Sequence, residues 1–310
     1  MSVTRSATPT RPALARVLAV AAAGGLVMAV ALGAGTEVGA ALAEAAGIDG
    51  GLSGRLVPAV LVSALAVPPV LWAARRAGRR AAWLGLGGDG GAWARSFLVG
   101  VAVTATAALL VLGAGTAAGL LSWSRPEPAT LVGFVAGNAL VAVGLEALPE
   151  EVTLRGHAWA TLRGRLGGRA AAFGTVAIFL LVPGASTVVA AATARLLGRE
   201  PDPVGLAPGG QHPVDYLVLL TFFGLALVAA RTAGTPAPLW TAIGTHLTFL
   251  TVNRVALEGE DRDAGWFAIE ETPDAVLLVP AYLLVATAAF AALRRRHTRR
   301  RRRAARLTAG

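Results

Sequence analysis

Apolar runs of membrane-spanning length recur along the whole chain and constrain its fold more than any other feature. A helix needs about 20 apolar residues to cross a bilayer core. Of the 310 residues, 55% are hydrophobic and 15% are charged, and the mean hydropathy is +0.62. This composition predicts an all-α, polytopic membrane helical bundle rather than a soluble domain. The predicted spans, about eight in number, cover residues 17–35, 56–74, 97–123, 131–160, 170–192, 216–230, 236–252 and 275–293.

The loops between these runs alternate in charge. Because cytoplasmic loops carry the excess of basic residues, the alternation predicts that both termini are cytoplasmic. No repeat of fixed period and no long linker divides the chain, so we expect one integral membrane domain over residues 1–310. The positive start and the first apolar run also fit a signal peptide, and that alternative stays open. The basic segments lie at residues 75–80, 163–169, 231 and 294–310, and the acidic ones at 37–49 and 257–274.

Arginine supplies all 28 basic residues, and cysteine is absent. The lack of cysteine excludes disulfides and thiolate metal sites. The arginine bias suggests a GC-rich bacterial genome, so we expect the protein in a bacterial plasma membrane. The net charge of +10 arises mainly in residues 294–310, a basic cytoplasmic tail that we expect to bind anionic lipid. No aromatic residue is interleaved with these arginines, which argues against nucleic-acid binding.

Two adjacent carboxylates, Glu150 and Glu151, stand at the end of the fourth apolar run. A charged group at that depth is kept for a partner, a cavity or a reaction. In a helix, Glu151 and Arg155 are one turn apart and can pair, whereas Glu150 points about 100° away. Pro149 removes one backbone hydrogen bond, which predicts a kink and a bare carbonyl near residue 145. We therefore expect Glu151 to be held and Glu150 to be free.

Glu146 adds a third carboxylate one turn before Glu150. Repulsion among three carboxylates suits a general acid or base in a shielded site. The alternative is that these are interfacial carboxylates neutralised by Arg155 and Arg163.

The segment Pro149–Gly156 resembles the first motif of a family of intramembrane proteases. It has two glutamates, an arginine four residues after the second, and a glycine directly after that. This is the pattern of the CAAX prenyl endopeptidase type II family, also called the Abi or CPBP family. The resemblance covers residues 130–255 and implies a core of that family within about eight helices. It also implies that Glu150 activates a water for attack on a peptide bond and that Arg155 holds the motif helix through Glu151.

The other two family motifs are incomplete in this chain. The second is a phenylalanine followed four residues later by histidine, and here Phe179 is followed by Pro183. The third is a histidine followed four residues later by asparagine or aspartate, and here His246 is followed by Leu250. Asn253 lies on the same helix face as His246 but about 10 Å further along, which makes it a poor substitute. We expect His246 to face the same cavity as Glu150.

The remaining histidines carry weaker expectations. His157 is seven residues after Glu150, so in an α-helix it would reach the cavity from the cytoplasmic end. Glu150 and His246 are the candidate ligands for a divalent metal such as zinc, although they make an incomplete set. His212 and His297 lie in a loop and in the tail, where we expect them to be solvated.

The sequence thus favours an intramembrane endopeptidase that cleaves a membrane-associated peptide or protein, with Glu150 as general base and His246 orienting the water. The site would lie near the cytoplasmic leaflet. One alternative is a catalytically weakened relative that binds a membrane peptide without cutting it, because Pro183 and Leu250 replace two family residues. Another is a small transporter subunit, in which buried carboxylates carry protons or cations.

Overall fold

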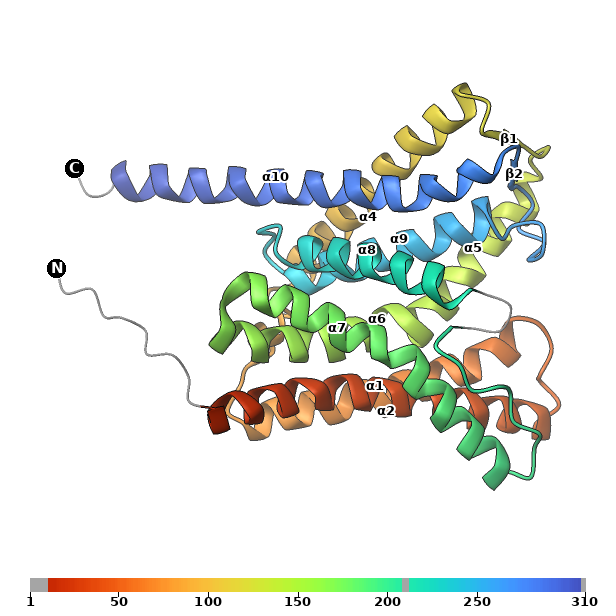
Figure 1. Ribbon diagram of the computed structural model, residues 1–310, viewed down its shortest axis with the longest axis horizontal. Helices are drawn as coiled ribbons and strands as arrows, with labels where there is room; N and C mark the ends of the chain where they lie inside the picture. The colour runs from red at the N-terminus through yellow and green to blue at the C-terminus, as the bar shows by residue number, and fades with distance from the viewer. Residues whose placement is uncertain (1–10, 208–211, 308–310) are drawn as a thin grey trace.

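The protein is a helical bundle with a small two-stranded sheet at its end (Figure 1). The computed structural model describes residues 11–207 and 212–307. Two π-helical segments and the short α6 join α5 and α7 into one continuous helix. The α-helices are α1 (Arg11–Ala45), α2 (Gly51–Arg76), α3 (Ala81–Leu84), α4 (Gly90–Ala117), α5 (Pro128–Ala142), α6 (Leu148–Glu150), α7 (Trp159–Leu196), α8 (Pro213–Arg231), α9 (Pro238–Ala256) and α10 (Leu278–Leu307). The π-helical segments are Val143–Ala147 and Glu151–Ala158, and a 3-10 turn, Pro273–Leu277, precedes α10.

The predicted all-α membrane bundle is confirmed. Within the two described ranges, six helical segments are long and apolar enough to cross a membrane. Helix α9 is not one of them, because its threonines, His246, Asn253 and Arg254 lower its hydropathy. Most residues in its first three turns are buried. The six segments are Pro12–Ala45, Gly51–Arg76, Gly90–Ala117, Pro128–Leu196, Pro213–Arg231 and Pro273–Arg306.

The longest of these segments, Pro128–Leu196, folds back on itself at Gly167. Gly167 has φ 78° and ψ 177°, a conformation that glycine adopts without steric cost. The helical arms before and after Gly167 then pack together, with Leu162 and Ala171 in one buried cluster. The basic loop expected at residues 163–169 is therefore this reversal. Pro183 and Gly184 in the middle of the fifth apolar run predict a break in the helix. That prediction is wrong, because α7 continues through both residues, as packed neighbours allow in membrane helices.

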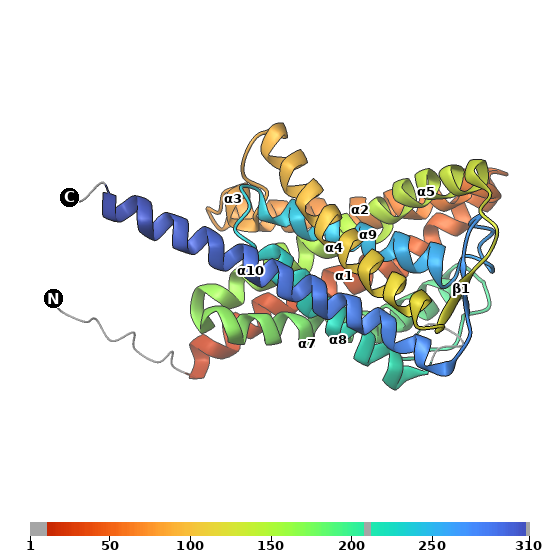
Figure 2. The same cartoon turned by 90° about the horizontal axis from the view of Figure 1, so that it is seen from above.

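The two ends of the bundle differ in charge, and Figures 1 and 2 show which elements meet at each. The start of α1, the ends of α2 and α8, the Gly167 reversal and the far end of α10 lie at one end, which we call the arginine-rich end. At the opposite, acidic end, β1 (Leu121–Trp123) pairs antiparallel with β2 (Ala268–Glu270), with Leu121 opposite Glu270. The acidic segment 258–263 precedes β2.

Close contacts between helices hold the core together. Helix α1 packs along α2 and α7, and α4 packs along α9. Gly100 on α4 faces the carbonyl of Thr241, and Gly244 on α9 faces the carbonyl of Phe97. In both places a Cβ atom would overlap the facing backbone, so only glycine permits this approach. The α4–α9 contact fixes α9, which carries His246.

We predict that Gly100→Ala destabilises the protein by about 1–3 kcal/mol, because the new methyl group pushes α4 away from α9. Thermal unfolding in detergent measures the change. Gly113→Ala on the same helix is the matched control, since a Cβ there meets nothing within 4 Å. Its expected effect is neutral to stabilising, and equal losses in both variants would contradict the close contact.

Candidate functional site

The helix that carries the three glutamates, residues 143–158, is called the motif helix. It is wound as a π-helix on both sides of Pro149. In this register the Leu148 amide donates to the Val143 carbonyl, so Pro149 leaves the Gly144 carbonyl without its donor. The Ser63 hydroxyl on α2 donates to that carbonyl at 2.5 Å. The sequence predicted a bare carbonyl near residue 145. In the π register the carbonyl without a backbone donor is that of Gly144, and Ser63 of α2 supplies its hydrogen bond.

Glu151 is the centre of a buried ion cluster, which we define as Glu151, Arg155 and His246. One carboxylate oxygen of Glu151, Oε1, lies 3.4 Å from Arg155 Nη1 and 3.0 Å from His246 Nδ1. Glu151 and Arg155 are fully buried, and the Arg155 guanidinium stacks 4.3 Å from the centre of the Phe179 ring. The predicted Glu151–Arg155 pair is confirmed, and His246 is a second partner that spacing along one helix did not indicate.

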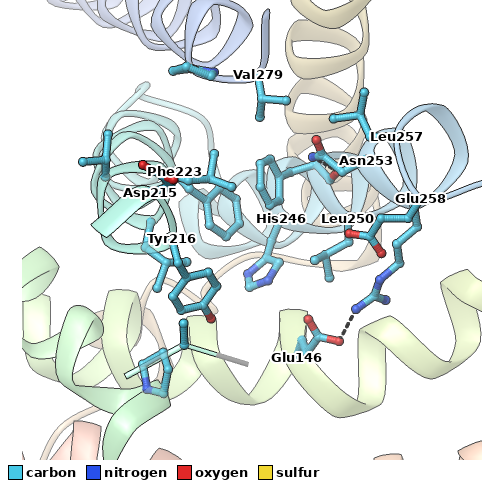
Figure 3. A pocket seen from close by; sticks show the side chains of 18 of the residues that line it. Glu146, Asp215, Tyr216, Phe223, His246, Leu250, Asn253, Leu257, Glu258 and Val279 are labelled. Carbon is cyan, nitrogen blue, oxygen red and sulfur yellow. Dashed lines mark hydrogen bonds and ion pairs between the residues drawn. The ribbon is translucent and has the colours of Figure 1, made fainter. Parts of the chain in front are cut away.

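Glu146 has a separate partner on another helix. Arg254 Nη2 of α9 lies 2.6 Å from Glu146 Oε1, and Arg254 Nη1 donates to the Asn138 side chain at 3.1 Å (Figure 3). Two of the three carboxylates, Glu146 and Glu151, therefore have an arginine partner. Arg254 was missed at the sequence level, although a charged residue in an apolar segment is itself a signal that a partner exists.

Glu150 differs from both neighbouring glutamates. Its side chain is only 9% exposed, and its Oε2 has no hydrogen-bond partner among the described residues. Glu150 lines a cavity of about 950 Å³ between the motif helix, α7, α8, α9 and α10. Glu146 lines the same cavity but is paired with Arg254, so Glu150 is the cavity-lining glutamate without an ion pair among the described residues.

His246 lines the same cavity as Glu150. Figure 3 shows its ring pointing between Tyr216, Phe223 and Leu250. The Phe223 ring meets the imidazole edge to face, with centroids 4.9 Å apart. Because the ionised Glu151 carboxylate can only accept, His246 Nδ1 donates to it, which leaves Nε2 for the cavity.

Pro183 and Leu250, the positions that the motif resemblance pairs with histidine and asparagine, line this cavity too. Five residues of the three motif segments therefore line one cavity: Glu150, Phe179, Pro183, His246 and Leu250. Asn253 also lines the cavity, but its amide donates to the Phe249 carbonyl and the Tyr282 hydroxyl, each at 2.7 Å. It is held by α10 rather than placed beside His246.

The expectation for His157 is wrong. Its Nε2 lies 3.1 Å from the Val20 carbonyl of α1, its ring packs on Trp83, and it does not line the cavity. A π-helix takes more residues for each turn than an α-helix, so the seventh residue after Glu150 no longer returns to the same face.

The position of the site along its helix is clear. Glu150 lies near the middle of the arm between Pro128 and Gly167. The cavity lining extends to His212, Asp215 and Glu270, which belong to the acidic end. His212 borders this mouth and pairs with Asp215 at 3.5 Å, while His297 is exposed on α10.

The donor set does not fit a zinc site. Catalytic zinc sites take three protein ligands. In the part of the chain that the structure describes, no three His, Asp or Glu side chains are grouped to hold a metal ion. Of the two candidate ligands, His246 already uses Nδ1 for Glu151. We therefore derive the chemistry from the side chains alone.

Comparison with protein-family models, with curated proteins and with solved structures finds no match to this chain. The function is therefore inferred from the geometry of the site and from the motif resemblance.

We predict that Arg155→Met lowers the free energy of unfolding by about 3–5 kcal/mol, because it leaves the buried Glu151 carboxylate without its cation. Arg199→Met is the control, since Arg199 pairs with an exposed Glu44, and its cost should stay below about 1 kcal/mol. Adding Glu151→Gln to Arg155→Met should recover part of the loss. Denaturant titration in detergent measures all three, and similar small losses throughout would contradict a buried ion pair.

Proposed function

We propose that the protein is an intramembrane endopeptidase of the CAAX type II, or Abi, class that hydrolyses a membrane-associated peptide or protein in a bacterial plasma membrane. One observation carries the proposal: Glu150, with an unpartnered carboxylate oxygen, lines the same cavity as His246, whose Nδ1 is fixed by Glu151. A general base and a group that stabilises developing charge are the two parts that hydrolysis needs.

In this mechanism Glu150 accepts a proton from a water molecule in the cavity, and the resulting hydroxide attacks the carbonyl carbon of the peptide bond. Negative charge then develops on the carbonyl oxygen. His246, when protonated at Nε2, donates to that oxygen, because Glu151 stabilises the positive imidazolium through Nδ1. Glu150 finally returns the proton to the leaving amine, which completes the cleavage.

The substitutions in the family motifs favour a second candidate, a weakened relative that binds a membrane peptide without cutting it. Pro183 and Leu250 both line the cavity and provide neither a proton donor nor a hydrogen-bonding side chain there. The cavity and its apolar walls would still accept a peptide segment.

For the orientation in the membrane we propose eight crossings, with the arginine-rich end in the cytoplasm. The two arms around Gly167 count as separate crossings, and α9 adds the eighth. Both chain ends then lie in the cytoplasm, since α1 begins and α10 ends at the arginine-rich end.

The exposed arginines of α10 would contact anionic lipid, and we assign no nucleic-acid partner. The cavity mouth would face the outer side.

We predict that Glu150→Gln lowers peptide turnover by about 100-fold or more while the protein stays folded. A quenched, lipid-anchored peptide library in liposomes provides the assay. Glu44→Gln, which changes an exposed glutamate far from the cavity, is the matched control and should retain full turnover. Undiminished cleavage by Glu150→Gln would refute the base assignment, and no cleavage by the folded wild type would favour the binding protein.

We also predict that Pro183→His combined with Leu250→Asn raises turnover about tenfold or more, because it supplies both missing groups to the cavity. The same liposome assay measures this gain. Leu181→His, at an exposed position outside the cavity lining, is the control and should bring no gain. A folded double variant without a gain would mean that the family correspondence does not extend to these positions.

A further inference from the structure

A second, smaller cavity lies at the arginine-rich end, away from the proposed catalytic site. Its volume is about 190 Å³, and α7, α8, the α8–α9 loop and α10 all contribute to its lining. The residues that matter for the argument are Trp159, Arg163, Arg231, Thr232 and Arg294. Among the described residues, no acidic side chain lines it. Three guanidinium groups therefore surround a space that contains no carboxylate.

Two of these arginines are placed by the same aromatic ring. The guanidinium carbons of Arg163 and Arg231 lie 5.1 and 4.9 Å from the centre of the Trp159 ring. Arg163, Arg231 and Arg294 form no ion pair within residues 11–207 and 212–307. Like charges held this close repel each other, so an external anion would stabilise the arrangement.

Two hydrogen bonds to backbone carbonyls fix the Arg231 guanidinium, and its third nitrogen has no acceptor among the described residues. It is 7% exposed, its Nε donates to the Arg155 carbonyl and its Nη2 to the Leu84 carbonyl, both at 3.2 Å. No described residue accepts a hydrogen bond from its Nη1. The left-handed Gly85 makes room for this side chain, since a Cβ there would lie 2.6 Å from the guanidinium.

A residue that lines the same cavity has an unsatisfied donor. Trp159 is 8% exposed, and its indole Nε1 is buried without a hydrogen-bond partner among the described residues. An indole N–H can only donate, as can a guanidinium. Such a donor calls for an acceptor outside these residues, either a water molecule or a bound ligand.

We propose that this cavity binds a phosphate group. A phosphate carries negative charge and several acceptor oxygens, which match three guanidinium groups and one indole N–H. The group could be the headgroup phosphate of an anionic lipid or a free phosphate ion. Its position favours the lipid, since basic pockets between membrane helices at this level bind lipid headgroups. The inference is independent of the proposed protease activity.

The test is calorimetric titration of the full-length protein in neutral detergent. The ligands are dioctanoyl phosphatidylglycerol, dioctanoylglycerol as its phosphate-free counterpart, and inorganic phosphate. Arg163→Gln with Arg294→Gln removes two cavity arginines. Arg165→Gln with Arg296→Gln is the matched control, since it removes two exposed arginines from the same segments that do not line the cavity. Trp159→Phe removes the indole N–H and reduces the ring on which Arg163 and Arg231 stack, without changing the charge.

We expect phosphatidylglycerol to bind and dioctanoylglycerol not to bind. The cavity double variant should weaken binding roughly 10- to 30-fold, and the control pair less than about threefold. Trp159→Phe should weaken it severalfold and keeps the proposal testable if the double variant misfolds. Inorganic phosphate could instead bind with the same dependence on these residues, and with an affinity that added lipid does not change. That result would also support the site and would identify the free ion as its ligand. Equal losses in both double variants, or no phosphate dependence, would overturn the proposal.

Discussion

The buried ion cluster of Glu151, Arg155 and His246 is the interaction on which the rest of the site depends. Glu151 and Arg155 are fully buried and His246 is 1% exposed. Separating such partners leaves an uncompensated charge in the protein interior, so the motif helix and α9 must keep their relative position. Phe179 of α7 stacks on Arg155, and Arg231 of α8 donates to its carbonyl. Four helices are thus fixed around the cavity.

The π-helical winding gives three glutamates that are close in sequence three different environments. Glu146 turns toward Arg254, Glu151 toward the ion cluster, and Glu150 toward the cavity. The same winding leaves the Gly144 carbonyl for Ser63, which ties the motif helix to α2. π-helical turns are rare and occur frequently at functional sites. Its presence on both sides of Pro149 fits a segment shaped for chemistry rather than for stability alone.

Features that depend on local spacing could be predicted from the sequence, and features that depend on packing could not. Hydropathy was enough for a membrane bundle, and the four-residue spacing was enough for Glu151 with Arg155. The pairing of Glu146 with Arg254 joins residues 108 apart, which no local pattern reveals. The π register, which redirects His157, depends on how Pro149 is accommodated. The extent of the cavity toward the acidic end required the positions of α8 and α10.

The central claim, that Glu150 is the cavity-lining glutamate without an ion pair among the described residues, is tested most directly by chemical labelling. The protein in liposomes would be treated with an apolar carbodiimide, and peptide mapping by mass spectrometry would measure labelling at each carboxylate. A carboxylate that an arginine holds is shielded from the reagent, so we predict labelling at Glu150 and little at Glu146 or Glu151. Labelling of Glu151 at the level of Glu150, or none at Glu150, would contradict this division of roles.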